Sequence, residues 1–298
     1  MTGVMSRILL TGATGFIGSA VLKRAMAGGH EVASLVRPGG EVPTGTARLT
    51  GSMADPPWEA MEAFAADTLI HCAWIATPGL YLESPENWNH AEWSESLIMR
   101  LVEQGLHQLV VLGTCIEYRM GPDRLHETET PLEPKTPYAL AKDRLRRRLV
   151  ERLTDHPGVR LAWGRVFYPY GEGEHPARLC SSLISTLRRG DEIVLRTPDS
   201  TKDYIHISDL AEAILRVAEA RVDGPVNLGT GTGVTVREIA DRLAAMLGRA
   251  DRVRASSPTV PDPLGDIVAD AGRLRKLGWE PKVTLEPGLR RLIDTTIA

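Results

Sequence analysis

The chain of 298 residues is long enough for one large domain or two of ordinary size. Hydrophobic residues make up 43% and charged residues 24%, which is typical of a globular protein with a real core. The 35 Lys and Arg residues against 38 Asp and Glu residues give a net charge of −3, which disfavours a nucleic-acid partner. No stretch predicts a membrane span, and the first residues lack a secretory pattern, so we expect a soluble cytoplasmic protein.

The cysteines Cys72, Cys115 and Cys180 are far apart and odd in number. This spacing favours neither a disulfide framework nor a zinc site. We therefore expect no bound metal.

Short apolar runs alternate with helical patterns over the first 170 residues. The apolar runs predict buried strands at residues 7–11, 31–36, 67–74, 108–114 and 159–166. Helical patterns lie at residues 16–28, 85–105 and 137–154. The last pattern has an apolar stripe made of Leu140, Leu145, Leu149 and Leu153. Strands that alternate with helices predict a parallel sheet covered on both faces.

The pattern changes after Tyr170. Residues 171–176 and 197–203 are polar and turn-rich, and the proline-rich residues 253–266 predict a loop. The remaining segments predict short strands near 193–196 and 225–228 and helices at 208–221, 234–248 and 286–296. We therefore predict an α/β fold, in which residues 1–170 form a Rossmann-type doubly wound parallel sheet. Residues 171–298 would form a smaller, mixed α/β part that binds substrate.

Three glycines, Gly12, Gly15 and Gly18, follow the first strand and open the first helix. In a dinucleotide-binding turn such glycines permit a tight turn, a close approach to the pyrophosphate and close packing of helix on strand. The pyrophosphate then binds free N–H groups at the helix N-terminus. A plain strand-to-helix turn is the alternative, because the spacing differs from the commoner G-x-G-x-x-G, but the strand before and the helix after favour a nucleotide.

Arg37 stands at the end of the second predicted strand, where NAD-binding proteins carry an acidic residue for the ribose hydroxyl. A guanidinium suits the additional phosphate of NADP. Glu31 lies at the wrong end of that strand to compete. The position favours NADP(H), although a solvated arginine is the alternative.

Tyr138 and Lys142 lie four residues apart at the start of a predicted helix, so both side chains share one face. A tyrosine with its ordinary pKa near 10 is a poor acid or base at neutral pH, and a neighbouring cation lowers that pKa. Taken alone, the pair could equally be an ordinary surface contact.

Seven segments strengthen the chemical interpretation: TGATGFIG, HCAW, VVLGTCIEY, PYALAK, GRVFYPYG, KDYIHISDLAEAI and VNLGTG. In type and order they resemble the extended short-chain dehydrogenase/reductase family, and more narrowly its nucleotide-sugar epimerase/dehydratase/reductase branch. The resemblance runs over nearly the whole chain. It implies a Rossmann fold, an NAD(P) cofactor, a nucleotide-sugar substrate and a homodimer paired through the helices at 85–105 and 137–154.

The resemblance also implies residue roles. Thr114 would bond the substrate oxygen, Tyr138 would donate or accept the proton, and Lys142 would lower the pKa of Tyr138 and hold the nicotinamide ribose. The implied cofactor-binding residues are Gly12, Thr14, Gly15, Phe16, Ile17, Gly18, Arg37, Cys72, Ala73, Tyr138, Lys142 and Val166. The implied substrate-binding residues are Thr114, Cys115, Tyr168 and Lys202.

This chain departs from the family pattern near the reacting centre. Cys115 and Ile116 occupy the positions where the dehydratases have an acidic pair, so water elimination lacks its acid and base. Cys115 also lies three residues before Tyr118, whereas family members with an active-site cysteine have it two before the tyrosine. A small buried side chain is the simpler interpretation of Cys115.

The diphosphate contacts that the family implies are altered as well. Lys202 stands where an arginine is common, and Tyr168 replaces an asparagine. The segment from Asp262 to Asp266 lacks an expected arginine. Replacement cations would be Arg178, Arg188, Arg189 and Arg196, each of which could equally be solvated.

We therefore expect an NADPH-dependent ketoreductase acting on a nucleotide-linked 4-keto-6-deoxy sugar, with Tyr138 as general acid. An NAD(P)-dependent nucleotide-sugar epimerase is the first alternative, which Arg37 disfavours. A non-catalytic, nucleotide-sensing relative is the second, because fold does not fix function.

Overall fold

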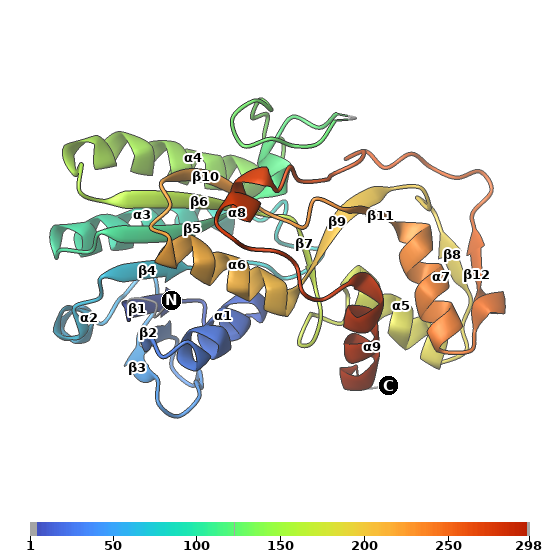
Figure 1. The fold of residues 1–298 in the computed structure, drawn as a ribbon, viewed down its shortest axis with the longest axis horizontal. Helices are drawn as coiled ribbons and strands as arrows, with labels where there is room; N and C mark the ends of the chain where they lie inside the picture. Colours follow the sequence, from blue (N-terminus) through green and yellow to red (C-terminus); the bar gives the residue numbers. More distant parts are fainter. Residues whose placement is uncertain (1–4, 122, 297–298) are drawn as a thin grey trace.

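A computed structural model describes residues 5–121 and 123–296, which form a large sheet-containing unit and a smaller unit beside it (Figure 1). The large sheet is wholly parallel, in the order β10-β6-β5-β4-β1-β2-β3. Its strands are β1 (Arg7–Thr11), β2 (Glu31–Val36), β3 (Ala47–Thr50), β4 (Thr68–His71), β5 (Gln108–Thr114), β6 (Arg160–Val166) and β10 (Gly224–Leu228). The predicted doubly wound Rossmann-type fold is confirmed.

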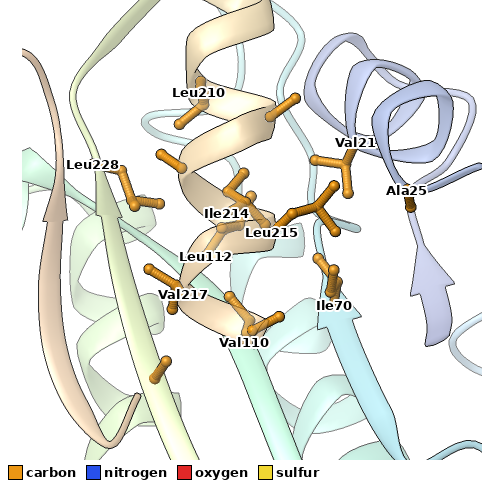
Figure 2. Close-up of a cluster of buried hydrophobic side chains, with 14 of the residues drawn as sticks. Val21, Ala25, Ile70, Val110, Leu112, Leu210, Ile214, Leu215, Val217 and Leu228 are labelled. Carbon is orange, nitrogen blue, oxygen red and sulfur yellow. The ribbon is translucent and has the colours of Figure 1, made fainter. Parts of the chain in front are cut away.

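Helices cover both faces of this sheet, because alternate strand residues point to opposite sides. Ile8 and Leu10 of β1 face one core, while Leu9 faces the other. The first core is covered by α1 (Phe16–Ala27) and α6 (Ile207–Glu219). The second is covered by α2 (Trp58–Phe64), α3 (Glu86–Glu103) and α4 (Pro137–Arg152). Figure 2 shows Ile214 and Leu215 of α6 packed toward the sheet beside α1.

The smaller unit has its own apolar core. It contains the strands β7 (Tyr168–Tyr170), β9 (Thr201–His206) and β11 (Gly233–Thr235), and the pair β8 (Ile193–Leu195) and β12 (Val253–Ala255). Its helices are α5 (Leu179–Arg188), α7 (Val236–Met246) and α9 (Leu285–Thr295), whose side chains Ile184, Leu243 and Leu289 meet in that core. A short helix, α8 (Gly272–Lys276), packs Leu274 against the large unit.

The chain returns to the large sheet after residue 170, through α6 and β10. Segments of the two units therefore alternate along the chain. A division into domains of residues 1–170 and 171–298 stays a prediction. Among the described residues, no helix is both long enough and apolar enough to cross a bilayer.

Several elements differ from the prediction. The strand predicted at 67–74 ends at His71, and β12 occupies the start of the predicted loop at 253–266. The predicted apolar stripe of α4 was wrong at Leu140, which is 36% exposed, since Ala141 and Lys142 point inward instead. The unpredicted elements are β3, α2, β7, α5, β9, β11 and α8.

Candidate functional site

The glycine turn lies where β1 and β4 end side by side, at the point where the strand order reverses. Gly12 has a φ of +73°, and a Cβ atom there would lie 2.7 Å from the backbone nitrogen of Ala73. A Cβ atom on Gly18 would collide with the carbonyl oxygen of Gly12. These two positions admit only glycine, so the turn can bring α1 close to both strands.

A groove of about 570 Å³ opens over this turn. The helix α1 has no side-chain cap and no acidic residue in its first turn, so its first N–H groups are available to a phosphate. Predicted cofactor residues that line the groove are Gly12, Thr14, Gly15, Phe16, Ile17, Gly18, Arg37, Cys72 and Ala73. The groove therefore has the shape and the donors that a dinucleotide needs.

Arg37 is exposed directly after β2 and lines the groove. Residues 51–54, which follow β3, line it as well. The sequence analysis missed them because β3 has four residues of which only Leu49 is buried. The available signal was Gly51–Ser52 after a short β-branched and apolar run.

A second cavity of about 470 Å³ adjoins the groove, and Ile17, Cys72 and Trp74 line both. Its walls bring together the remaining predicted residues from both units of the fold. They are Thr114, Cys115, Tyr138, Lys142, Val166, Tyr168 and Lys202. The predicted catalytic residues and the predicted substrate residues thus line one cavity, which adjoins the groove.

The start of α4 positions Tyr138 and Lys142. Thr136 caps the helix by accepting a hydrogen bond from the Ala139 N–H at 3.2 Å. Lys142 Nζ donates to the carbonyl oxygen of Leu112 at 2.6 Å and lies 4.1 Å from the ring centroid of Trp74. Burial lowers the pKa of the Lys142 ammonium to about 8.

Burial raises the pKa of the Tyr138 phenol far above its ordinary value, and the nearby positive charge of Arg178 acts in the opposite direction. The lowering expected from Lys142 is not found here, because that ammonium bonds to a backbone carbonyl and faces Trp74. Tyr138 therefore holds its proton at neutral pH. A protonated phenol is the state that a proton donor requires.

A buried polar network holds the end of β5, where Thr114 lies. The Thr114 N–H donates to Glu117 Oε1 at 2.9 Å. Glu117, which is fully buried, also accepts from Trp163 Nε1 at 3.0 Å and from Arg165 Nε at 2.9 Å. The sequence analysis missed this network, although an arginine in the apolar strand β6 was a signal of a buried charged partner.

Trp74 separates the two cavities and was not among the predicted site residues. Its indole N–H donates to Asn87 Oδ1 at 2.8 Å, and Asn87 is fully buried. Tyr81 contacts Tyr138 edge-on, with 4.8 Å between ring centroids. These aromatic side chains form part of the lining of the second cavity, and the tryptophan of the HCAW segment was the available sequence signal.

Cys72, Cys115 and Cys180 all line the second cavity, and burial raises the pKa of each thiol above its ordinary value. Burial raises the pKa values of Cys72 and Cys115 to about 12, so both thiols stay protonated. Cys115 behaves as the small buried side chain that its spacing favours.

Lys202 lies in the cavity, but its ammonium forms an ion pair with Asp262 Oδ2 at 2.8 Å. Of the four possible replacement cations, only Arg178 lines the cavity in the described part of the chain. Arg188 bonds carbonyl oxygens at the end of α9, and Arg189 pairs with Asp191. Arg196 is exposed.

The wholly parallel sheet, the glycine turn at its switch point and the adjoining Thr–Tyr–Lys group define a Rossmann-fold protein of the short-chain dehydrogenase/reductase type. Residues 8–229 match the model of the NAD dependent epimerase/dehydratase family. The chain belongs to this enzyme family.

Individual relatives agree with this assignment. The chain is 26% identical to UDP-glucose 4-epimerase of Streptomyces lividans, over 92% of its own length and 91% of that protein. It is also 26% identical to dTDP-6-deoxy-L-talose 4-dehydrogenase (NAD(+)) of Aggregatibacter actinomycetemcomitans, over 80% and 89% of the two lengths. The crystal structure of UDP-glucose 4-epimerase from Thermus thermophilus in complex with NAD superposes with a TM-score of 0.83 at 26% identity, covering 97% of this chain and 98% of that one.

Proposed function

We propose that this protein is an NADPH-dependent ketoreductase that reduces a ketone on a sugar. One observation carries the proposal: Thr114, Tyr138 and Lys142 line a cavity that adjoins the glycine-turn groove. A ketone in that cavity would lie between the proton donor and the place for a nicotinamide. Catalysis would then depend on holding these groups in register.

Each side chain has a distinct task in this scheme. The bound cofactor would supply the hydride. The Thr114 hydroxyl would hold the ketone oxygen, and the Tyr138 phenol would give that oxygen its proton, a contribution of about 10²–10⁴-fold in rate. Lys142 would hold the nicotinamide ribose, for which its ammonium must turn from the Leu112 carbonyl that it now bonds.

The preference for NADPH is part of the proposal and depends on Arg37. Within the described chain its guanidinium has no carboxylate at ion-pair distance, and it lines the groove at the end of β2. A free guanidinium provides a fork of donors for the additional phosphate.

We further propose a cytoplasmic homodimer that pairs through α3 and α4. On α4, Leu140 and Val150 are large apolar side chains that stay exposed in the single chain. A partner helix would cover them, as a helix bundle requires.

An epimerase that oxidises and re-reduces one carbon is the second candidate, favoured by the similarity to UDP-glucose 4-epimerases over most of the chain. A nucleotide-linked 4-keto-6-deoxy sugar is the first substrate to test. The purified protein is incubated with NADPH and a panel of keto-sugars, and the absorbance of NADPH is followed together with product formation. We expect one NADPH to be oxidised per product formed.

Product formation without net cofactor change would establish the epimerase instead. Cofactor binding without turnover of any sugar would indicate the non-catalytic relative.

A further inference from the structure

The cationic side chains of the substrate cavity differ in whether they form an ion pair with a carboxylate. Lys202 is buried, and its ammonium lies 2.8 Å from Asp262 Oδ2 and donates to the carbonyl oxygen of Gly265. Asp262 Oδ2 accepts a second bond, from Ser200 Oγ at 2.5 Å. Although burial acts to raise it, these two bonds hold the pKa of Asp262 below its usual value, so this carboxylate is ionised at neutral pH.

The N-terminus of α5, another place where an anion could bind, is also occupied. The buried carboxylate of Glu174 accepts a hydrogen bond from the Ser181 N–H at 2.8 Å, in the first turn of that helix. A phosphate at this position would therefore meet a carboxylate as well as the helix end.

Arg178, like Lys142, lines the cavity without an ion-pair partner in the described parts of the chain, and it also reaches the cofactor groove. It lines both the groove and the cavity. Its guanidinium carbon lies 5.5 Å from the ring centroid of Phe16, the first residue of α1. This places its charge beside the first residue of α1, where the cofactor phosphates are expected.

The walls near that ion pair suit a neutral ring with hydroxyl groups. Tyr168 and Tyr204 face one another with 5.8 Å between ring centroids, and both line the cavity. Burial raises the pKa of each phenol, so both stay uncharged. An ammonium donor beside a carboxylate acceptor matches two adjacent hydroxyls, one of which accepts while the other donates.

We infer that the cavity takes an uncharged sugar, such as a simple glycoside or a free sugar, whose adjacent hydroxyls bond the pair of Lys202 and Asp262, rather than a sugar carried on a nucleoside diphosphate. A diphosphate in this place would either be repelled by the negative charge of Asp262 or break the ion pair of Lys202 and Asp262. Both outcomes are unfavourable. The inference rests on the proposed reductase for the identity of the reaction, but the effect of the ion pair on diphosphate binding can be tested without turnover.

Binding of nucleoside diphosphates is the direct test. The NADPH-loaded protein is titrated with UDP and with dTDP in a calorimeter. We expect no saturable binding to the wild type at millimolar ligand. In Asp262→Asn the ammonium of Lys202 is released, and we expect the same ligands to bind at least ten-fold more tightly.

Asp266→Asn is the matched control, because it makes the same change in the same loop. Asp266 accepts a bond from the Thr201 N–H at 3.1 Å and does not touch Lys202. We expect it to bind nucleotides no better than the wild type, and we expect Lys202→Met to abolish the gain of Asp262→Asn. Tight binding of UDP or dTDP by the wild type, or an equal gain in the control, would overturn the inference.

Turnover separates this inference from the proposed function. Oxidation of NADPH by uncharged keto-glycosides in preference to the same sugars on nucleotides would support both. A lower KM for the nucleotide-linked sugars would overturn the inference and leave the reductase standing. If no ketone oxidises NADPH, the reductase proposal fails, while the titrations still show whether the cavity binds a nucleoside diphosphate.

Discussion

Replacing Glu117 by glutamine should destabilise the fold and displace Thr114. The carboxylate accepts bonds from the Thr114 N–H at 2.9 Å, Trp163 Nε1 at 3.0 Å and Arg165 Nε at 2.9 Å. A glutamine has one acceptor oxygen and would turn its amide N–H groups toward donors. It would also leave Arg165, which is 2% exposed, without its counter-charge.

Breaking a buried ion pair from one side typically costs about 3–5 kcal/mol. Arg165 keeps its bond to the Tyr118 hydroxyl at 2.9 Å, so we expect the lower end of that range, about 3 kcal/mol. In a chain of this size such a loss lowers the thermal midpoint by roughly 5 °C.

Urea denaturation followed by far-ultraviolet circular dichroism measures this loss without depending on the fluorescence of Trp163. Glu133→Gln is the control, because Glu133 is about half exposed and pairs only with the exposed Lys135. We expect the control to change the free energy of unfolding by less than about 0.5 kcal/mol. A loss under about 1 kcal/mol in Glu117→Gln would refute the assignment of the network as the support of this strand end.

Three further variants test the cleft. Tyr138→Phe should lower turnover at least about 100-fold while NADPH binding, measured by fluorescence, stays unchanged; full activity would show that another group supplies the proton. Arg37→Asp should lower kcat/KM with NADPH about ten-fold or more and shift preference toward NADH, and an unchanged ratio of the two cofactors would show that Arg37 is only solvated. Because burial lowers the pKa of Lys142 from 10.5 to about 8, its charge destabilises the folded state below pH 8, and this penalty disappears as the pH rises from 8 to about 10.5. The stability advantage of Lys142→Met over the wild type should therefore shrink across that pH window in urea denaturation, and a constant difference would contradict the lowered pKa.

The strands and helices with strong local patterns were predictable. The bounds of β1, β2 and β5 agree with the prediction, because each is a short run of apolar side chains that pack on both faces of a parallel sheet. β9 was missed because its buried residues include Lys202 and Asp203. The partners of these two charged side chains lie far along the chain, so a local sequence pattern predicts that the side chains are exposed.

The site divides in the same way. The glycine turn and the pair of Tyr138 and Lys142 lie within single strand–helix units, so sequence spacing alone places them. Trp74 and Arg178 lie in the cleft because long-range packing puts their segments there. Asn87 fixes the indole of Trp74 from another element, and no spacing within the chain predicts that contact.

A cationic side chain attracts an anionic ligand only weakly when a carboxylate already pairs with it, so the number of cations in this cleft is a poor guide to the anions it binds. The structure places Arg37, Arg178 and Lys202 around the groove and the adjoining cavity, and by number these cations would suit a dinucleotide and a diphosphate-linked substrate together. In the structure Lys202 is neutralised by Asp262, a residue of the loop that an arginine-containing segment was expected to occupy. A buried lysine that pairs with a carboxylate offers a hydroxyl group a donor and an acceptor, but it offers a phosphate almost no net charge. The inferred preference for an uncharged sugar therefore depends most on Asp262, because this carboxylate pairs with the lysine that would otherwise attract an anion.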